Sequence, residues 1–298
     1  MEQMRFDPAA AAAHLEWSWQ TGLGLGDLPP GSRPSSLSGG YAAQALFVER
    51  IGEPVIGWKI AGASPRGLRG ELINAPATGC LVQSRVPPSG SILNFRVDSR
   101  ATLETEVGFR FGRTVSPAKE AFDTSMLDRA FVAIEVVCSR YIDRKAVAQP
   151  SFVADNLGFH ALICGEQIPF ADDCSFDEDA GIWRNGERIA STLNGDDRTR
   201  PFESLAFLWK EFARQGRTLE RGAIVTTGTL SAPVDCTSSA NLTARFADAT
   251  VGVALRFSSD NAQDDDGNVR NKGVLKSRVN VEHYDWLNGA SPFPQSEF

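Results

Sequence analysis

The sequence of 298 residues has few histidines and cysteines, and what it lacks excludes several classes of protein. Three histidines and no GxSxG motif argue against a serine-hydrolase triad. There is no HExxH zinc motif and no Walker phosphate loop. The five cysteines are odd in number, scattered and without a CxxC pair, which is typical of reduced thiols and not of a disulfide framework or zinc site.

Long apolar runs and positive charge are also missing. No stretch of about 18 apolar residues exists that could span a membrane. The first segment, Met1 to Gln20, lacks the basic start and apolar core of a secretory signal. The net charge of −7 and the pI near 5.1 argue against nucleic acid or an anionic membrane surface as the main partner. We therefore expect a cytoplasmic protein that binds neither.

Short strands are predicted to dominate residues 91–257, interrupted by helices near 118–122, at 151–156 and at 201–214. Two further helices are predicted earlier in the chain, at 8–21 and 39–50. This order is typical of an α+β fold with a β-rich core, in contrast to a doubly wound sheet. We divide the chain into an N-terminal helical region packed on the core, a β-rich catalytic core, and an acidic loop with a C-terminal extension. Their bounds are 1–75, 76–258 and 259–298, and the last includes a possible strand at 274–281.

Two glutamates are prominent in a segment that otherwise alternates like a β-strand, Thr102 to Phe111. Side chains alternate between the two faces of a strand, so Glu104 and Glu106 point to one face, about 7 Å apart along the chain. Like charges on one face repel, and burying either without a partner is costly. A divalent cation would relieve that repulsion. The alternative is an ordinary solvated face, on which Lys or Arg of a neighbouring strand balances the pair.

A third glutamate, Glu135, lies in the apolar run Phe131 to Val137, where an unpaired charge is again out of place. Three carboxylates in apolar, strand-like surroundings suit a hard cation that prefers oxygen ligands, such as Mg²⁺ or Mn²⁺. The residues alone leave open whether these glutamates bind metal or are solvated.

Lys59 is an unexpected charge in the predicted strand Pro54 to Ala61, with Trp58 and Ile60 on either side of it. Such a lysine either extends to solvent at a sheet edge or lies in a pocket. Desolvation in a pocket lowers the pKa of a lysine and makes it a usable acid or base. A purely structural role is the alternative.

Several segments, in this order, resemble the hydratase/decarboxylase branch of the fumarylacetoacetate hydrolase superfamily, which includes 2-keto-4-pentenoate hydratases and 4-oxalocrotonate decarboxylases. The resemblance extends from about residue 8 to residue 257. The segments that carry it are GYAAQ at 40–44, GWKI at 57–60, ETEV at 104–107, AIE at 133–135 with SR at 139–140, VADN at 153–156 and VTTG at 225–228.

The resemblance implies a fold, a cofactor and a class of substrate. The family's metal carboxylates match Glu104, Glu106 and Glu135, and its active-site lysine matches Lys59. Its members fold around a twisted, barrel-like β-roll, use Mg²⁺ or Mn²⁺, and commonly form homo-oligomers. Their substrates are 2-oxo acids or the corresponding dienols from the degradation of aromatic compounds.

Further site residues follow from the same resemblance. Thr227 and the backbone at Gly228 are the candidates for holding the substrate carboxylate. Asn74 stands where hydratases usually have an aspartate that assists proton transfer or water addition, and an asparagine does not titrate. His160 follows Asn156 in a segment where the family usually has small residues, including serine. We therefore name Lys59, Asn74 and His160 as candidate catalytic residues.

The leading functional hypothesis is a metal-dependent lyase that hydrates or decarboxylates a 2-oxo acid or its dienol through a metal-stabilised enolate. Asn74 favours decarboxylation, because that reaction needs no positioned water. One alternative is carbon–carbon hydrolysis of an acylpyruvate, with His160 as the base that activates water. Another is a catalytically weak member that binds a small oxo acid or a protein partner.

Overall fold

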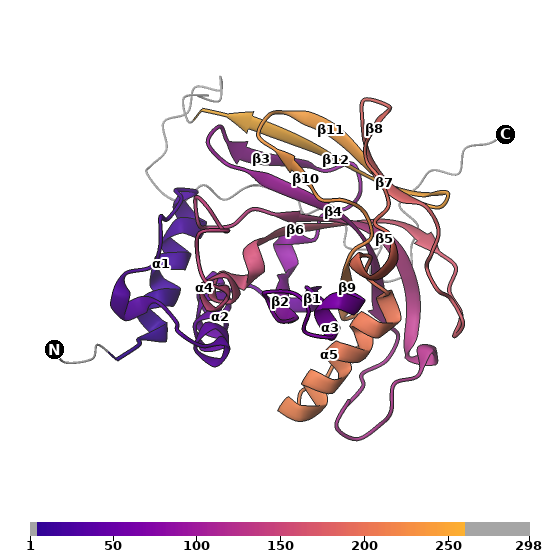
Figure 1. Ribbon diagram of the computed structural model, residues 1–298, viewed down its shortest axis with the longest axis horizontal. Coiled ribbons are helices and arrows are strands. Elements are labelled where there is room, and N and C mark those ends of the chain that lie inside the picture. The colour runs from indigo at the N-terminus through magenta and orange to yellow at the C-terminus, as the bar shows by residue number, and fades with distance from the viewer. Residues whose placement is uncertain (1–4, 260–298) are drawn as a thin grey trace.

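The computed structural model describes residues 5–259, and its strands form two sheets (Figure 1). The helices are α1 (Pro8–Thr21), α2 (Leu37–Ile51), α3 (Pro65–Leu68), α4 (Gln149–Ala154) and α5 (Pro201–Gln215). The strands are β1 (Val55–Ala61), β2 (Ala77–Val82), β3 (Ile92–Arg96), β4 (Ala101–Phe111), β5 (Leu127–Val137), β6 (Phe159–Ile168), β7 (Ala180–Arg184), β8 (Glu187–Ala190), β9 (Ile224–Thr229), β10 (Val234–Cys236), β11 (Ala240–Phe246) and β12 (Ala249–Ser258). The strand expected at 274–281 and nearly all of the C-terminal extension lie outside the described residues.

The larger sheet has seven strands in the order β2-β1-β9-β4-β5-β6, and β10 pairs with β4. Its two edges approach each other at Asn156, in the short 3₁₀ turn η4 (Asn156–Gly158) that leads into β6. The Asn156 amide accepts a hydrogen bond from the backbone N–H of Cys80 at 2.7 Å and donates one to the Cys80 carbonyl at 2.8 Å. An asparagine side chain therefore pairs with the edge strand β2 as a neighbouring strand would. The sheet is a barrel-like roll.

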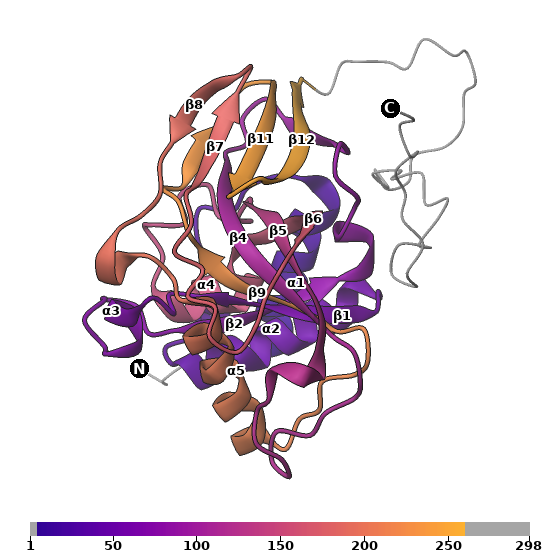
Figure 2. The same ribbon diagram turned by 90° about the vertical axis from the view of Figure 1, so that its right-hand side faces the viewer.

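The smaller sheet has the strand order β3-β12-β11-β7-β8 and packs on the outer face of the roll (Figures 1 and 2). The alternation along β4 decides which residues meet it. Thr105 donates a hydrogen bond to the carbonyl of Gly181 on β7 at 3.2 Å, and Leu103 and Val107 are fully buried. Their neighbours Glu104 and Glu106 consequently point to the inner face of the roll.

Helix α5 covers the outer face of β9 and β1. Its apolar stripe is buried, Ser204 donates to the Thr227 carbonyl at 2.6 Å, and Phe212 meets Trp58 edge-on at 5.0 Å. Away from α5, helices α1, α2 and α4 pack together beside β2 (Figure 1). Gln44 of α2 donates to the carbonyls of Thr78 and Val153, which ties these helices to the roll.

Four of the five predicted helices are confirmed in place, including 8–21 and 201–214. The prediction of a helix near 118–122 is wrong. Lys119 donates to the Ser116 carbonyl, and the Glu120 carboxylate accepts from Ser116 N–H and pairs with Arg113, so the segment is a turn. A helix of five residues forms too few hydrogen bonds to offset the cost of nucleation, and the local bonds of the turn compete with it.

Strand β1 belongs to the roll although it precedes the predicted boundary at residue 75, because it pairs with both β2 and β9. Within residues 5–259, no helix is long and apolar enough to cross a membrane.

Candidate metal centre and active site

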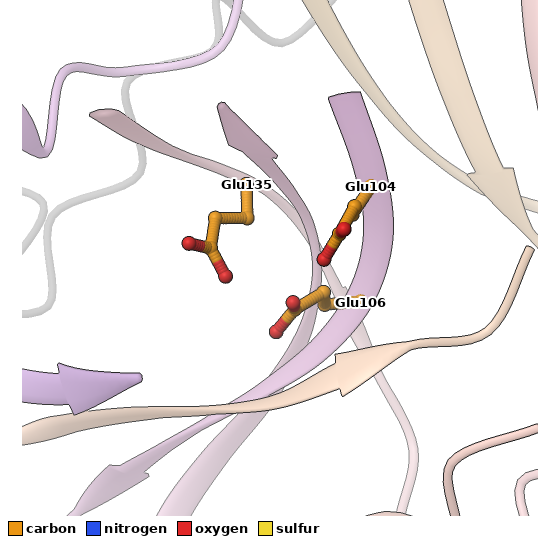
Figure 3. Close-up of side chains that lie close together, drawn as sticks. All are labelled: Glu104, Glu106 and Glu135. Atoms are coloured by element: carbon orange, nitrogen blue, oxygen red, sulfur yellow. The ribbon is translucent and has the colours of Figure 1, made fainter. Parts of the chain in front are cut away.

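Three glutamates meet on the inner face of the roll (Figure 3). Glu104 and Glu106 extend from β4, and Glu135 extends from the neighbouring strand β5, directly opposite Glu104 in the register. One carboxylate oxygen from each lies within 4.8 Å of the others. The alternation and pairing of two antiparallel strands are therefore sufficient to assemble the cluster.

The cluster is buried, and one of its oxygens has no partner. Glu106 is 0% exposed and Glu135 is 1% exposed, whereas Glu104 is half-buried. Glu106 Oε2 accepts a hydrogen bond from the Gly228 N–H at 2.9 Å, but its Oε1 has no hydrogen-bond partner. A buried carboxylate oxygen without a donor is costly, so this group fits a cation or a proton.

Lys59 reaches the same cluster from β1. Its side chain is 2% exposed and forms an ion pair with Glu135. Its Nζ also lies 3.4 Å from the carbonyl oxygen of Leu157, to which it donates. The lysine is therefore held in the interior of the roll and does not extend to solvent. Gly79, its neighbour on β2, leaves space for it, because a Cβ there would lie 2.9 Å from Lys59 Cγ.

The charges of this site do not cancel. Three carboxylates against one ammonium leave two net negative charges when all the groups are ionised. Burial, and next the charge of Glu135, raise the pKa of Glu106 well above its usual range, and the same two causes raise the pKa of Glu104. A divalent cation supplies the missing charge, and carboxylate oxygens are the ligands that Mg²⁺ and Mn²⁺ prefer. The donor set thus fits such an ion.

The two threonines of β9 point to different surroundings. The Thr227 hydroxyl donates to the Val107 carbonyl at 2.9 Å, so it serves the sheet. Thr226 is opposite Lys59 in the parallel register, on the inner face of the roll, and its buried hydroxyl has no partner. The sequence analysis names Thr227 and not Thr226, and a substrate-binding role of Thr227 stays a prediction. The available signal was the alternation of side chains, which allows only one of two adjacent residues to face the glutamates.

The comparisons with known proteins agree with this geometry. No family model matches the chain. Two curated proteins, 2-keto-4-pentenoate hydratase from Paraburkholderia xenovorans (strain LB400) and 2-keto-4-pentenoate hydratase 3 from Pseudomonas putida, are each 22% identical over 227 residues. The alignment covers 74% of this chain and 84% of either relative.

A solved structure of 4-oxalocrotonate decarboxylase from Pseudomonas putida G7, complexed with magnesium and adipate, has the same fold. It matches with a TM-score of 0.69 and 19% identity, over 84% of this chain and 97% of that chain. The chain is therefore similar in sequence to 2-keto-4-pentenoate hydratases and shares the fold of that decarboxylase. The barrel-like roll expected from the sequence is thereby confirmed, and its N-terminal helical region with it.

Asn74 departs from what the superfamily resemblance implies, and the structure places it on an exposed loop beside a cavity of about 490 Å³. Gln149 of α4 holds this loop, because its amide donates to the Ala75 carbonyl at 2.6 Å and accepts from the Ala75 N–H at 3.2 Å. Leu157 also lines the cavity, and its carbonyl oxygen receives the Lys59 ammonium. Asn74 therefore lines the same cavity as Leu157, the residue whose carbonyl binds Lys59.

The turn that presents this carbonyl has an unusual backbone. Asn156 and Leu157 have φ values of 51° and 54°, in the left-handed region. Asparagine tolerates that region, whereas a leucine there costs about 1–2 kcal/mol. The strained turn lies directly over the Lys59 ammonium.

His160 has different neighbours from the glutamates. Its ring packs on Phe95 of β3 at 4.7 Å, and its Nε2 lies 3.5 Å from Arg85 Nη1. Burial, followed by the charges of Arg85 and Arg140, lowers its pKa well below the usual range. The structure thus brings together Lys59 and the three glutamates, and it places His160 between the roll and the smaller sheet. A catalytic role of His160 stays a prediction.

Proposed function

We propose that this protein belongs to the fumarylacetoacetate hydrolase superfamily and is a lyase that depends on a divalent metal and acts on a 2-oxo acid or its dienol, by hydration or decarboxylation. The observation that carries the proposal is the buried set of three glutamates with one lysine, whose two excess negative charges match a divalent cation. The names of the relatives support the class of reaction, since they are two hydratases and one decarboxylase that was solved with magnesium.

In this proposal Glu104, Glu106 and Glu135 hold Mg²⁺ or Mn²⁺. When bound, the ion supplies Lewis-acid stabilisation of negative charge on the oxygens of a 2-oxo acid. Lys59 moves the proton, because its ammonium is fixed between Glu135 and the Leu157 carbonyl, on the face that the glutamates share.

The buried hydroxyl of Thr226 lies on the same face without a hydrogen-bond partner, and in this proposal it orients a substrate oxygen. Thr227 and Gly228 do not contact the substrate in this proposal and instead support the residues that do. Thr227 fixes β9 against β4, and Gly228 holds Glu106 through its N–H. These two residues therefore support the site from the backbone in this proposal.

Asn74 favours decarboxylation over hydration. It lies at the cavity wall, where a titrating side chain would be needed to move a proton to or from water, and its amide does not titrate. The same residue supports a second candidate function, binding of an oxo acid without turnover. Acylpyruvate hydrolysis with His160 as base receives less support, because the ring lies against Phe95 and Arg85. The homo-oligomer remains a prediction.

Calorimetric binding of oxalate, a stand-in for a 2-oxo acid chelate, tests the proposal. The wild type is expected to bind oxalate only with Mg²⁺ or Mn²⁺, and Glu106→Gln is expected to lose that binding. Glu187→Gln, an exposed glutamate on β8, is the matched control and should bind like the wild type. If the wild type binds neither metal nor oxalate, the proposal is wrong. If it binds both but turns over no 2-oxo acid, the second candidate is correct.

A further inference from the structure

A second cavity, here called the outer cavity, lies on the outer face of β1 and β2. Its volume is about 960 Å³, which is the size of a small-molecule site. Trp58 of β1 and Cys80 of β2 line it. Trp58 precedes Lys59, whose side chain forms an ion pair with Glu135 on the inner face of the roll. Because side chains alternate along a strand, the outer cavity and the three glutamates lie on opposite faces of one sheet.

The buried part of this lining is mostly apolar. Val48 of α2 and Trp58 of β1 are 6% and 9% exposed, and both line the outer cavity. The buried polar side chain of Gln44 is already used within the protein, because its amide donates to the carbonyls of Thr78 and Val153. The body of an occupant therefore meets a surface that favours an apolar group.

Arg217 lies over this apolar lining. Its guanidinium carbon is 4.0 Å from the centre of the Trp58 ring and 4.8 Å from that of Phe212. The guanidinium has no hydrogen bond or ion pair with any residue that the structure describes. Cys80, which lies near it, supplies no negative charge, because burial raises the pKa of its thiol to about 12. Partial burial lowers the pKa of Arg217 itself, so an anion bound there would be favoured.

The other charges of the outer cavity differ from Arg217. Arg214 pairs with Glu211 at 2.8 Å, and the Glu220 carboxylate accepts hydrogen bonds from two threonine hydroxyls. Arg221 and Glu49 are exposed and have no printed ring contact that would hold them in place. Arg217 is therefore the charge of this lining that is both held by aromatic rings and available to an anion.

We propose that the outer cavity is a second ligand site, which binds an aromatic carboxylic acid with its ring on the apolar lining and its carboxylate on Arg217. A guanidinium binds a carboxylate through two parallel, charge-assisted hydrogen bonds, which are stronger than neutral ones. The aromatic ring of the ligand adds apolar contact with the lining beside Trp58. The site is separate from the three glutamates and does not rest on the proposed function.

The first test compares 2-naphthoate with 2-naphthamide, a neutral ligand of nearly the same shape. Calorimetry is carried out with Mg²⁺ and saturating oxalate, which occupies the candidate metal centre. The wild type is expected to bind 2-naphthoate at least about tenfold more tightly than 2-naphthamide, as a charge-assisted hydrogen bond provides. Arg217→Met should bring this ratio to about one and leave oxalate binding unchanged. Lys210→Met removes an exposed charge of α5 outside the lining and should keep the wild-type ratio.

The second test fills the outer cavity. Ala45 and Ala42 are both exposed on α2, but only Ala45 lines the outer cavity. Ala45→Trp should weaken the binding of 2-naphthoate at least about tenfold, because the indole occupies the space of the ligand ring. Ala42→Trp, the matched control, should bind it like the wild type.

Three results would overturn the inference. They are equal affinities of the wild type for the two ligands, displacement of 2-naphthoate by oxalate, and an equal effect of Arg217→Met and Lys210→Met. Failure of the wild type to bind oxalate overturns the proposed function only, because the Arg217 and Ala45 variants still locate 2-naphthoate in the outer cavity or exclude it from there.

Discussion

At the scale of single residues, the unpaired polar atoms carry the functional information. The carboxylate oxygen Oε1 of Glu106 and the hydroxyl of Thr226 are both buried without a hydrogen-bond partner. Thr227, one residue later, satisfies its hydroxyl on the Val107 carbonyl. Folding gains nothing from an unsatisfied hydroxyl, since burial removes its bonds to water. A ligand, and not the stability of the fold, explains such groups best.

The two threonines therefore provide a matched pair of variants. Valine has nearly the shape of threonine without the hydroxyl. Thr226→Val should leave the free energy of unfolding unchanged or slightly higher, because the hydroxyl has no partner in the protein. It should weaken oxalate binding at saturating Mg²⁺ by about tenfold, which corresponds to the loss of one hydrogen bond to a charged ligand. Thr227→Val should lower the free energy of unfolding by about 1 kcal/mol and leave oxalate binding unchanged. Urea unfolding and calorimetry measure both effects, and the reverse assignment would show that Thr227 faces the ligand.

The glutamates also predict a coupling between metal and protons. Burial and the charge of Glu135 raise the pKa of Glu106, so the metal-free protein retains a proton in the cluster above the usual range of a carboxyl. A carboxylate must lose its proton to bind a metal. Binding of Mg²⁺ at pH 6 should therefore release protons, and the affinity should increase with pH. Calorimetry in buffers of different ionisation enthalpy measures the release, and a heat that is independent of the buffer contradicts it.

At the scale of secondary-structure elements, alternation along a strand is predictable from sequence and closure of the roll is not. The period of two is enough to place Glu104 and Glu106 on one face, and pairing with β5 adds Glu135. The contact that closes the roll joins Asn156 to Cys80, which are far apart in sequence, and no local pattern encodes it.

This closure can be tested with asparagines in similar backbone conformations. Asn156→Ala removes both hydrogen bonds to Cys80 and leaves a buried N–H and a buried C=O unpaired, so we expect a loss of about 2–4 kcal/mol in the free energy of unfolding. Asn185 has a φ of 52°, close to the 51° of Asn156, but lies exposed in the turn between β7 and β8. Asn185→Ala should therefore cost less than about 1 kcal/mol, the strain alone. Equal losses in the two variants would mean that the backbone, and not the hydrogen bonds, sets the cost.

At the scale of the whole molecule, the smaller sheet is attached to the roll by a mixed apolar and charged contact. Phe95 of β3 stacks on Phe257 of β12 and on the ring of His160 of β6. Arg85 lies beside that ring and also over Trp19 of α1, so one cluster joins both sheets and the N-terminal helices. Protonation of His160 would place a second positive charge beside Arg85. The repulsion would destabilise the contact between the two sheets and the N-terminal helices.

The stability of the fold should therefore depend on pH through His160. Burial, Arg85 and Arg140 lower its pKa well below the usual range, so the folded protein keeps the ring neutral while the unfolded chain takes up a proton near pH 6.5. Because the unfolded state binds more protons, stability falls as the pH drops below about 6.5, by about 1.4 kcal/mol for each pH unit until the folded pKa is reached.

His160→Gln removes this titration, so the difference in the free energy of unfolding between pH 7.5 and pH 5.5 should be about 1.4 kcal/mol smaller in the variant. Urea unfolding at the two pH values measures it. His14→Gln, on α1, is the control for loss of a histidine and should keep the wild-type difference. The slope with pH is the decisive quantity, because the variant also loses the stacking on Phe95 at every pH. An unchanged slope would mean that the folded protein protonates His160 as readily as the unfolded chain does, which would bring back its candidacy as an acid or base.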